Sequence, residues 1–591
     1  MRISSVSLRR TRLFMAPAVI LISLAGSPAL AQVDPWAPPA SYYNAATGVG
    51  STLKSQLYNT MKTGHIQRSY GDFRYSAAVH DRDPSNASRI LLVYNRLSVP
   101  STWDSGATWN REHTWPQSRQ PGSVSNSSTG NLGDPHALRP SDPGTNSARG
   151  NDPYGYAATT GNGRSLGGGV YFPGDTDKGD VARQLFYSDT RWGPELGLSL
   201  TSGTPGTNQM GYLSSLVAWH YMDPPDEFER RRNHTIYSSV YNPSYYTNNR
   251  NAYIDRPEYV WSIYMDQQND SQLFLAPGPD DPAGGSLRGF SVVTLVGPTT
   301  LLSQTVTLNK TGQDGTYFEI STSGYATATP RGRYNAFPMS GGGTASQNIN
   351  VALVIPANQP GAYSGQVTID NLDVTLSGGF GHGGTDDNDV VSMIAQALDH
   401  AEASFGANAD VDTIDVDLGS ISEGAGDLFV DIPVYNLEDA PGFTAKLDIE
   451  YGSASGDTAA LRIEPTLNIA NIPAGGAANV RATLNAAVAG SFAATYTIRT
   501  FDQRTAENWL EGTALTMRLS GVVESVSTFG DLNCDSVLDY SDVEPFALAI
   551  VDATSYGVMF PACDIHRADM NEDNVIDSRD VAGFVGALLQ P

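Results

Sequence analysis

The spacing of apolar and polar positions divides the chain into parts with different expected structures. Apolar residues recur with helical spacing at 52–61 and 178–186, and apolar runs suited to strands occur in the same region. Residues 32–275 are therefore expected to form an α+β domain. Beyond residue 286 the pattern changes to short alternating runs rich in Thr, Val, Ser and Gly, such as 304–308 and 348–354, which predict β-strands.

Two β-sandwich domains are predicted after the α+β domain. Residues 276–285 are rich in Pro and Gly and have the composition of a linker. Strand patterns separated by turn signals then cover 286–410 and, with examples at 428–434 and 494–498, 411–526. For 389–405 the periodicity does not distinguish a helix from a last strand.

Residues 530–591 contain an internal repeat that predicts two calcium-binding loops in a small helical module. Oxygen-bearing side chains occupy loop positions 1, 3, 5, 9 and 12, and an apolar helical pattern follows each loop. The candidate Ca²⁺ ligands are Asp531, Asn533, Asp535, Asp539 and Asp542 in the first loop, and Asp569, Asn571, Asp573, Asp577 and Asp580 in the second. Position 12 is Asp rather than Glu and position 6 lacks Gly, so the loops differ from the EF-hand.

The duplicated loop–helix units resemble dockerin-type modules. The resemblance implies bound Ca²⁺ and a cohesin-like or surface partner, whereas two acidic surface turns without metal are the alternative. Cys534 and Cys563 are the two cysteines of the chain, and both lie in this module. In an exported protein they are expected to form a disulfide.

The first 31 residues have the pattern of a secretory signal peptide. Several arginines precede an apolar run at 13–25, and Ala29-Leu30-Ala31 provides a cleavage site. The protein is therefore expected to be secreted. This run is too short for a membrane span, and no later segment approaches the roughly 20 apolar residues that a spanning helix needs.

The formal net charge of −26 is unfavourable for a nucleic-acid partner, but the charge is distributed unevenly. Residues 32–271 contain 20 Lys and Arg against 22 Asp and Glu, whereas 272–591 contain 12 against 40. The acidity therefore belongs to the C-terminal half. A nearly neutral N-terminal domain permits a local basic groove without predicting one.

The residues with the clearest chemistry lie between 111 and 151. Hydrolysis of a phosphodiester needs a hard metal ion on oxygen ligands, an imidazole that deprotonates water, and cations for the phosphate oxygens. This stretch supplies all three in Glu112, His113, Asn146 and several arginines. A strand ending at His113, a second strand near Leu138 and a helix starting near Asn146 would form a strand–strand–helix motif. Because neighbouring strand residues face opposite sides, Glu112 and His113 serve one centre only if the backbone bends there.

This layout is the ββα-metal motif of one nuclease superfamily, and the chain resembles bacterial endonuclease I over about residues 41–263. The resemblance rests on Asn110-Arg111-Glu112-His113-Thr114-Trp115-Pro116-Gln117-Ser118, His136-Ala137-Leu138-Arg139-Pro140, Asn146 with Arg149-Gly150-Asn151, Lys178-Gly179-Asp180-Val181-Ala182-Arg183, Trp219-His220 and Asn249-Arg250-Asn251. It implies that His113 is the general base, that Glu112 and Asn146 hold Mg²⁺, and that an arginine contacts the scissile phosphate.

The sequence leaves the roles of several residues open. Arg119 and Arg149 are the candidates for the phosphate contact, and Arg149 is as well suited to bracing the helix. His136 and Asn151 are candidates for supporting the metal ligands or contacting the substrate, with strand packing for His136 and helix stabilisation for Asn151 as the alternatives. Lys178, Asp180 and Arg183 are expected on a salt-bridged helix surface.

The implied function is that of a secreted, Mg²⁺-dependent and largely non-specific endonuclease. Its substrate would be DNA, with RNA left open, and its products would carry 5′-phosphates. One alternative is a surface assembly or adhesion protein whose nuclease domain is inactive, which would show a missing base or ligand; none is missing. The other is a metal-dependent phosphodiesterase for a substrate that is not a nucleic acid.

Overall fold

The computed structural model describes residues 34–155, 160–265, 268–375, 386–463, 467–503, 509–525 and 529–589. The expected signal peptide, residues 1–31, lies outside them. The chain divides into two compact units: Met1–Val292 with Gly297–Ala357 and Ala362–Gln396, and Val293–Val296 with Asn358–Gly361 and Ala397–Pro591. Within the described ranges, no helix is long and apolar enough to cross a membrane.

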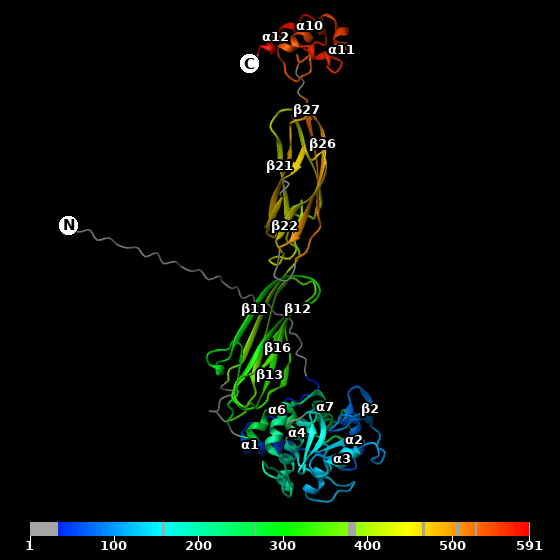
Figure 1. Ribbon diagram of the computed structural model, residues 1–591, viewed down its shortest axis with the longest axis vertical. Coiled ribbons are helices and arrows are strands. Elements are labelled where there is room, and N and C mark those ends of the chain that lie inside the picture. The colour runs from blue at the N-terminus through cyan, green and yellow to red at the C-terminus, as the bar shows by residue number, and fades with distance from the viewer. Residues whose placement is uncertain are drawn as a thin grey trace, which may run out of the picture. The chain divides into compact units, whose positions relative to one another are not determined.

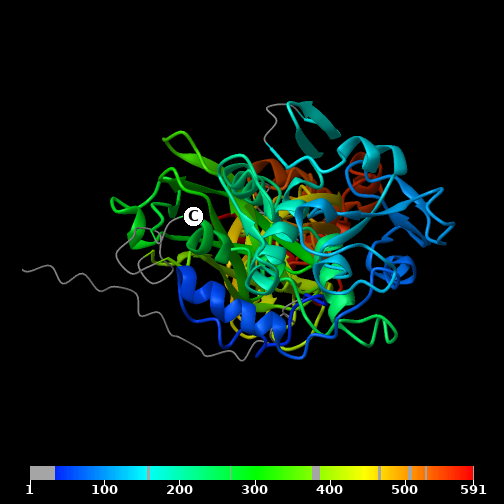
Figure 2. The same cartoon turned by 90° about the horizontal axis from the view of Figure 1, so that it is seen from below.

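Helix α4 (Lys178–Arg191) forms the centre of the N-terminal domain, and all of its residues after Lys178 are buried. Helices α1 (Gly50–Lys62) and α6 (Leu213–Met222) pack against it (Figure 1), and α1 is the long blue helix of Figure 2. The predicted helices at 52–61 and 178–186 are thus confirmed, and the second is longer than predicted. The other helices are α2 (Phe73–His80), α5 (Gly193–Leu196), α7 (Glu227–Tyr237), α8 (Ala252–Asp255) and α9 (Tyr259–Tyr264).

The strands of the N-terminal domain are short. They are β1 (Arg82–Asp83), β2 (Asn86–Leu91) and β3 (Ser98–Pro100) in one sheet, and the pairs β6 (Asn162–Gly167) with β7 (Val170–Gly174) and β8 (Ser199–Leu200) with β9 (Gln209–Met210). The strands β4 and β5 form a further pair and are described with the site. The result is the expected mixture of helices and strands.

Arginines and carboxylates pair around α4 in a network that we call the buried ion network: Arg96, Arg139, Arg183 and Arg232 with Asp81, Asp177, Asp180 and Glu229. All of these residues are buried except Arg96, which is half-buried. Asp81 Oδ1, for example, lies 2.8 Å from the Nε atoms of both Arg139 and Arg232. The prediction of an exposed salt-bridged surface is therefore wrong for Asp180 and Arg183, because both are buried. Removing one member would leave an uncompensated charge in the core.

The first β domain consists of a four-stranded and a five-stranded sheet. The first has the order β10 (Gln272–Leu275), β12 (Thr300–Thr311), β16 (Ala345–Ile355), β14 (Ala326–Thr329). The second has the order β11 (Leu287–Leu295), β18 (Asp389–Leu398), β17 (Gly361–Asn371), β13 (Thr316–Gly324), β15 (Gly332–Phe337). Strand β10 precedes the Pro- and Gly-rich segment 276–285, which therefore connects two strands of this domain. The open choice at 389–405 is decided in favour of strands.

The first β domain contributes side chains to the core of the N-terminal domain. Tyr317 of β13 and Ala336 of β15 are buried in the same apolar cluster as α1, α4 and α6. The Tyr317 hydroxyl donates to the backbone oxygen of His220 at 2.5 Å, and Arg333 pairs with Glu258 at 2.6 Å. The two domains therefore share one core.

The second β domain again has a four-stranded and a five-stranded sheet. Their orders are β19 (Glu402–Ser404), β21 (Leu428–Leu437), β25 (Ala477–Leu484), β23 (Leu461–Ile463), and β20 (Thr413–Ser422), β27 (Leu515–Glu524), β26 (Gly490–Asp502), β22 (Leu447–Gly456), β24 (Asn468–Ile472). Alternate residues of both sheets form one apolar cluster, which explains the period-two pattern of the sequence.

The C-terminal module contains helices α10 (Val543–Val551), α11 (Ala553–Met559) and α12 (Asp580–Leu588). Phe546 and Phe584 stack in its core with ring centres 3.8 Å apart. The expected disulfide between Cys534 and Cys563 is present. At position 6 of the two loops Ser536 and Asn574 have φ values of 73° and 60°, so the left-handed backbone that usually selects Gly is kept.

If the shared core holds, Tyr317→Ala should lower the free energy of unfolding of the N-terminal domain by about 3–5 kcal/mol, as for other large-to-small core substitutions. Tyr317→Phe keeps the ring and should cost only about 1 kcal/mol for the lost hydrogen bond. Seven of the eight tryptophans lie in the N-terminal domain, so tryptophan fluorescence during denaturation follows its unfolding. Equal stability of Tyr317→Ala and wild type would show that the domains have independent cores.

Candidate functional site

Two short strands and a helix carry the candidate catalytic residues. Strand β4 (Asn110–His113) pairs antiparallel with β5 (Leu138–Ser141), with His113 opposite Leu138. Helix α3 (Pro143–Arg149) follows directly. The Asp142 side chain accepts a hydrogen bond from Thr145 N at 2.8 Å and caps the helix. The expected strand–strand–helix layout is therefore present, with the helix starting three residues before Asn146.

Glu112 is buried, with 3% of its surface exposed, and two side chains hold its Oε1 atom. The Tyr94 hydroxyl donates to Oε1 at 2.7 Å, and Arg149 Nη1 lies 3.1 Å from the same atom. Burial raises the pKa of Glu112, and the Arg149 charge opposes this effect. Both of these side-chain contacts are made to Oε1 and neither to Oε2.

Tyr94 is held in a backbone conformation that bulky residues rarely adopt, with φ at 79°. Its N–H donates to Asp177 Oδ2 at 2.9 Å, and its carbonyl accepts from Gly163 N at 2.7 Å. Asp177 belongs to the buried ion network. The Tyr154 hydroxyl lies 2.6 Å from the Tyr94 hydroxyl and completes a chain of hydrogen bonds that ends on Glu112. The ion network thus fixes the side chain that orients Glu112.

His113 is buried at the end of β4, and its Nε2 lies 2.9 Å from the Leu132 carbonyl oxygen. A carbonyl can only accept, so Nε2 carries the proton and Nδ1 is the basic nitrogen. The ring stacks on Tyr70 with centres 4.9 Å apart. Burial lowers the pKa of His113 to about 4. The imidazole is therefore neutral near pH 7 and able to accept a proton.

Asn146 and Arg149 lie one turn apart on α3. Asn146 Nδ2 donates to Asn110 Oδ1 at 3.2 Å, and the Asn146 amide oxygen accepts no hydrogen bond in the described part of the chain. Arg149 is 1% exposed and donates to the backbone oxygens of His113 and Thr114 at 3.1 and 2.9 Å. Together with the ion pair to Glu112, these contacts link α3 to β4.

The other candidate residues, Arg119, Asn151 and His136, make contacts with other parts of the domain. Arg119 Nε donates to the Asn151 carbonyl at 2.8 Å, and Asn151 Nδ2 lies 3.2 Å from Ser118 Oγ. His136 is buried against Tyr187, with ring centres 4.7 Å apart, and its Nε2 lies 3.3 Å from the Asn249 oxygen. The contacts of His136 in the described part of the chain are thus not with Glu112, His113 or Asn146.

The sequence did not point to the tyrosines around Glu112 and His113. Tyr94 ends the apolar run Leu91-Leu92-Val93, which reads as a buried strand, and Tyr70 and Tyr154 belong to no motif. The feature that distinguishes Tyr94 is its positive φ, which is seen only in the folded backbone and cannot be recognised in the sequence. Tyr70, Tyr94 and Tyr154 are recognised as part of the site from their contacts with His113, Glu112 and one another.

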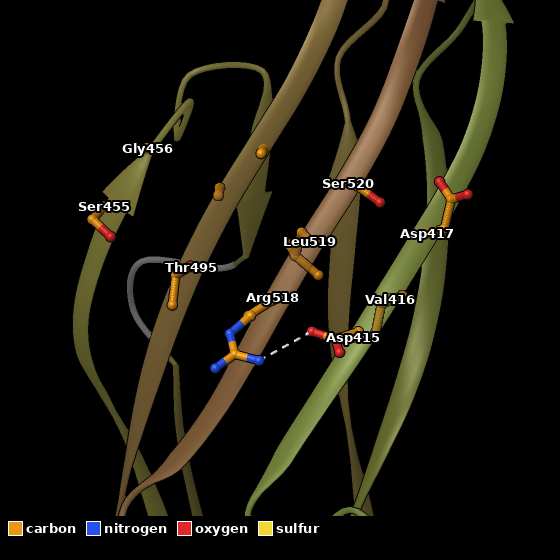
Figure 3. A pocket seen from close by; sticks show the side chains of 11 residues that line it. Asp415, Val416, Asp417, Ser455, Gly456, Thr495, Arg518, Leu519 and Ser520 are labelled. Atoms are coloured by element: carbon orange, nitrogen blue, oxygen red, sulfur yellow. Dashed lines mark hydrogen bonds and ion pairs between the residues drawn. The ribbon is translucent and has the colours of Figure 1, made fainter.

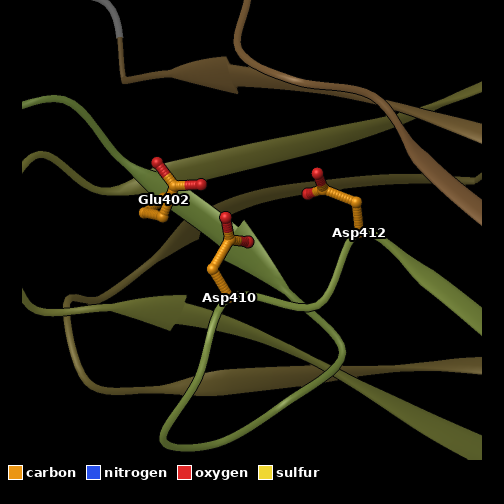
Figure 4. A group of neighbouring side chains, drawn as sticks. All are labelled: Glu402, Asp410 and Asp412. Carbon is orange, nitrogen blue, oxygen red and sulfur yellow. The ribbon is translucent and has the colours of Figure 1, made fainter.

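Two further groups of polar residues lie in the second β domain. A pocket of about 480 Å³ lies on the sheet that contains β20 and β27 (Figure 3), and its cation, Arg518, lies 3.5 Å from Asp415. Glu402, Asp410 and Asp412 form a compact group of carboxylates (Figure 4). The ion pair in the pocket is exposed, and exposed acidic groups are common without a metal. Neither feature combines a buried histidine with a buried carboxylate as the site on β4 does.

The N-terminal domain, which carries the site, is similar to a known protein family. The profile of the Endonuclease I family matches residues 49–258. An extracellular ribonuclease of Bacillus amyloliquefaciens is 36% identical over 252 residues, which cover 40% of this chain and 81% of that protein. An extracellular ribonuclease of Bacillus subtilis (strain 168) is 36% identical over 257 residues, covering 41% and 83%. Among solved structures, human protocadherin-24 EC1-2 has a TM-score of 0.23 at 9% identity, covering 43% of this chain and 99% of that one. The chain belongs to the Endonuclease I family, and it is a nuclease of the hydrolase class.

Proposed function

We propose that the protein is a secreted, Mg²⁺-dependent endonuclease that hydrolyses DNA and RNA to products with 5′-phosphates. The observation that carries the proposal is the arrangement of His113. The Leu132 carbonyl fixes the tautomer with a basic Nδ1, and the neighbouring residue is a buried, oriented carboxylate. The relatives named extracellular ribonucleases support RNA as a substrate and export of the chain. The disulfide supports export as well.

The oxygen donors at this site fit a hard divalent cation. Glu112 offers Oε2 and Asn146 its amide oxygen, and Mg²⁺ characteristically takes one or two protein oxygens and completes its shell with water and phosphate. When bound, Mg²⁺ would neutralise charge on the phosphate and on the leaving oxygen.

The residues of the chain account for the proton transfer. His113 Nδ1 accepts a proton from a water molecule, and the water oxygen forms a bond to phosphorus as the bond from phosphorus to the 3′ oxygen breaks. The 3′ oxygen leaves and is protonated from solvent, so the new phosphate stays on the 5′ side. Arg149 and Leu132 hold β4 and the imidazole in place during these steps.

His113→Ala should lower cleavage by about 10²–10⁴-fold, because only the proton acceptor is lost. Plasmid nicking and RNA cleavage, each with Mg²⁺ and with a chelator, measure this. His566→Ala, which removes an exposed histidine of the C-terminal module, is the matched control and should cleave like wild type. Near-normal cleavage by a folded His113→Ala variant would show that another group is the base.

Tyr94→Phe removes one hydrogen bond to Glu112 and keeps the ring. Loss of a group that orients a metal ligand typically costs about 10–100-fold in metal affinity or activity, so the Mg²⁺ concentration for half-maximal cleavage should rise within that range. Tyr171→Phe is the control, since Tyr171 packs on Tyr94 with ring centres 5.1 Å apart but makes no side-chain hydrogen bond to Glu112 in the described structure. An unchanged Mg²⁺ dependence in Tyr94→Phe would rule out this orienting role.

We infer that the C-terminal module binds two Ca²⁺ ions. The same hydrogen bonds recur in both loops: Ser536 N donates to Asp531 Oδ2 at 3.1 Å, and Asn574 N donates to Asp569 Oδ2 at 2.7 Å. Exposed valines also recur at equivalent positions, Val537 and Val575 in the loops and Val543 and Val581 in the helices. A cohesin-like or surface partner could pack against these exposed valines on either repeat.

Calcium titration of the full chain tests this inference. Asp531→Asn and Asp569→Asn should each remove one bound ion relative to wild type, and the double variant two, because each change weakens one loop only. Ca²⁺ should also raise the melting temperature of the module, since it binds the folded form. Equal uptake of Ca²⁺ by the double variant and wild type would leave the repeat as a purely structural unit.

A further inference from the structure

Arginine and tyrosine side chains alternate on the surface beside His113. Tyr70 stacks on the His113 ring, and the guanidinium of Arg111 lies 3.6 Å from the centre of Tyr70. Arg111 Nη1 also donates to the Tyr70 backbone oxygen at 2.6 Å, which fixes the pair. The set continues away from His113, and we call it the arginine–tyrosine strip: Arg68, Tyr70, Arg74, Tyr75, Arg111, Tyr245 and Tyr246.

The outer part of the strip is built from the start of α2 and the segment before Thr247. Arg74 donates from Nε to the Gly71 oxygen at 2.8 Å, and its guanidinium lies 5.4 Å from the Tyr75 ring centre. Tyr75 stacks on Tyr245 with centres 6.0 Å apart. Arg68 Nε donates to the Tyr246 oxygen at 2.7 Å. Backbone acceptors thus hold the arginines without neutralising them.

The charge of the strip is uncompensated. Within the described ranges, Arg68, Arg74 and Arg111 form no ion pair with a carboxylate, whereas the arginines of the buried ion network are all paired. Asp72, the acidic residue of the 68–75 segment, accepts a hydrogen bond from Ser69 N at 2.9 Å. A domain with nearly equal numbers of basic and acidic residues therefore presents unpaired positive charge next to the candidate base.

Tyr75 gives the strip an open aromatic face. It is 55% exposed, although most aromatic rings of the domain are buried. Exposed rings interleaved with cations are suited to unpaired nucleobases, because the rings stack on base faces and the cations contact the phosphates. In a duplex, neighbouring base pairs cover those faces.

We propose that the arginine–tyrosine strip binds the bases and backbone of a single-stranded segment next to the scissile bond, so that the enzyme prefers single-stranded to duplex nucleic acid. This inference rests on the proposed function, because the strip meets the candidate base through Tyr70. It deepens that function by assigning a substrate class and the side chains that select it.

The test compares a single-stranded RNA oligonucleotide with its duplex, using full-length protein. Tyr75→Ala should lower the ratio of kcat/KM for the single strand to that for the duplex by about tenfold, the effect expected for one lost base stack. Arg74→Ala should lower affinity for both forms and weaken the salt dependence of binding. Tyr325→Ala, which breaks another tyrosine pair on the first β domain, and Lys62→Ala, which removes an exposed cation, are the matched controls.

Fluorescence anisotropy with the labelled single strand, measured in chelator, reports binding without cleavage. An unchanged ratio in Tyr75→Ala, or an equal loss on both substrates, would overturn the strip as a single-strand site. If wild type binds the single strand more tightly than Tyr75→Ala but cleaves neither substrate with Mg²⁺, the proposed function fails while the strip stands. The two failures are therefore distinguishable.

Discussion

The structure of the nuclease domain depends on pairing the charges that it buries. Arg139, Arg183 and Arg232 of the buried ion network lie in its core, and each is paired with a carboxylate, because an unpaired buried charge is strongly destabilising. The carboxylates come from α2, α4 and α7 and from the residues next to them, so the pairing fixes these elements against one another. Asp177 extends this constraint to the site, because it also accepts the N–H of Tyr94. The position of Glu112 thus follows from ion pairs that are remote from the chemistry.

Charge also explains how a nearly neutral domain can handle a polyanion. Composition counts every arginine equally, but the folded domain uses several of them as internal partners. Arg68, Arg74 and Arg111 keep their charge at the surface because backbone oxygens, not carboxylates, hold them. A basic surface can therefore form without a basic composition.

Much of the fold could be predicted from the sequence, because its signals are local. Periodicity predicted α1 and α4, alternation predicted segments of β12, β16, β21 and β26, and the motif around His113 predicted the strand–strand–helix layout. The shared core and the role of Tyr94 could not be predicted, since they depend on contacts between distant residues and on a left-handed backbone. Asp180 and Arg183 were misplaced for a related reason: a charged residue is expected at the surface unless its partner, here Glu229, is known.

The Pro- and Gly-rich segment 276–285 shows how a local signal can be correct and still mislead about architecture. Such composition marks a turn whether the turn joins two domains or two strands. Here the strand before the segment, β10, is hydrogen-bonded to β12, and the strand after it, β11, lies in the other sheet of the same domain. A protease that cut this segment would therefore nick the chain without releasing the nuclease, because β10 would stay in its sheet and Tyr317 in its core.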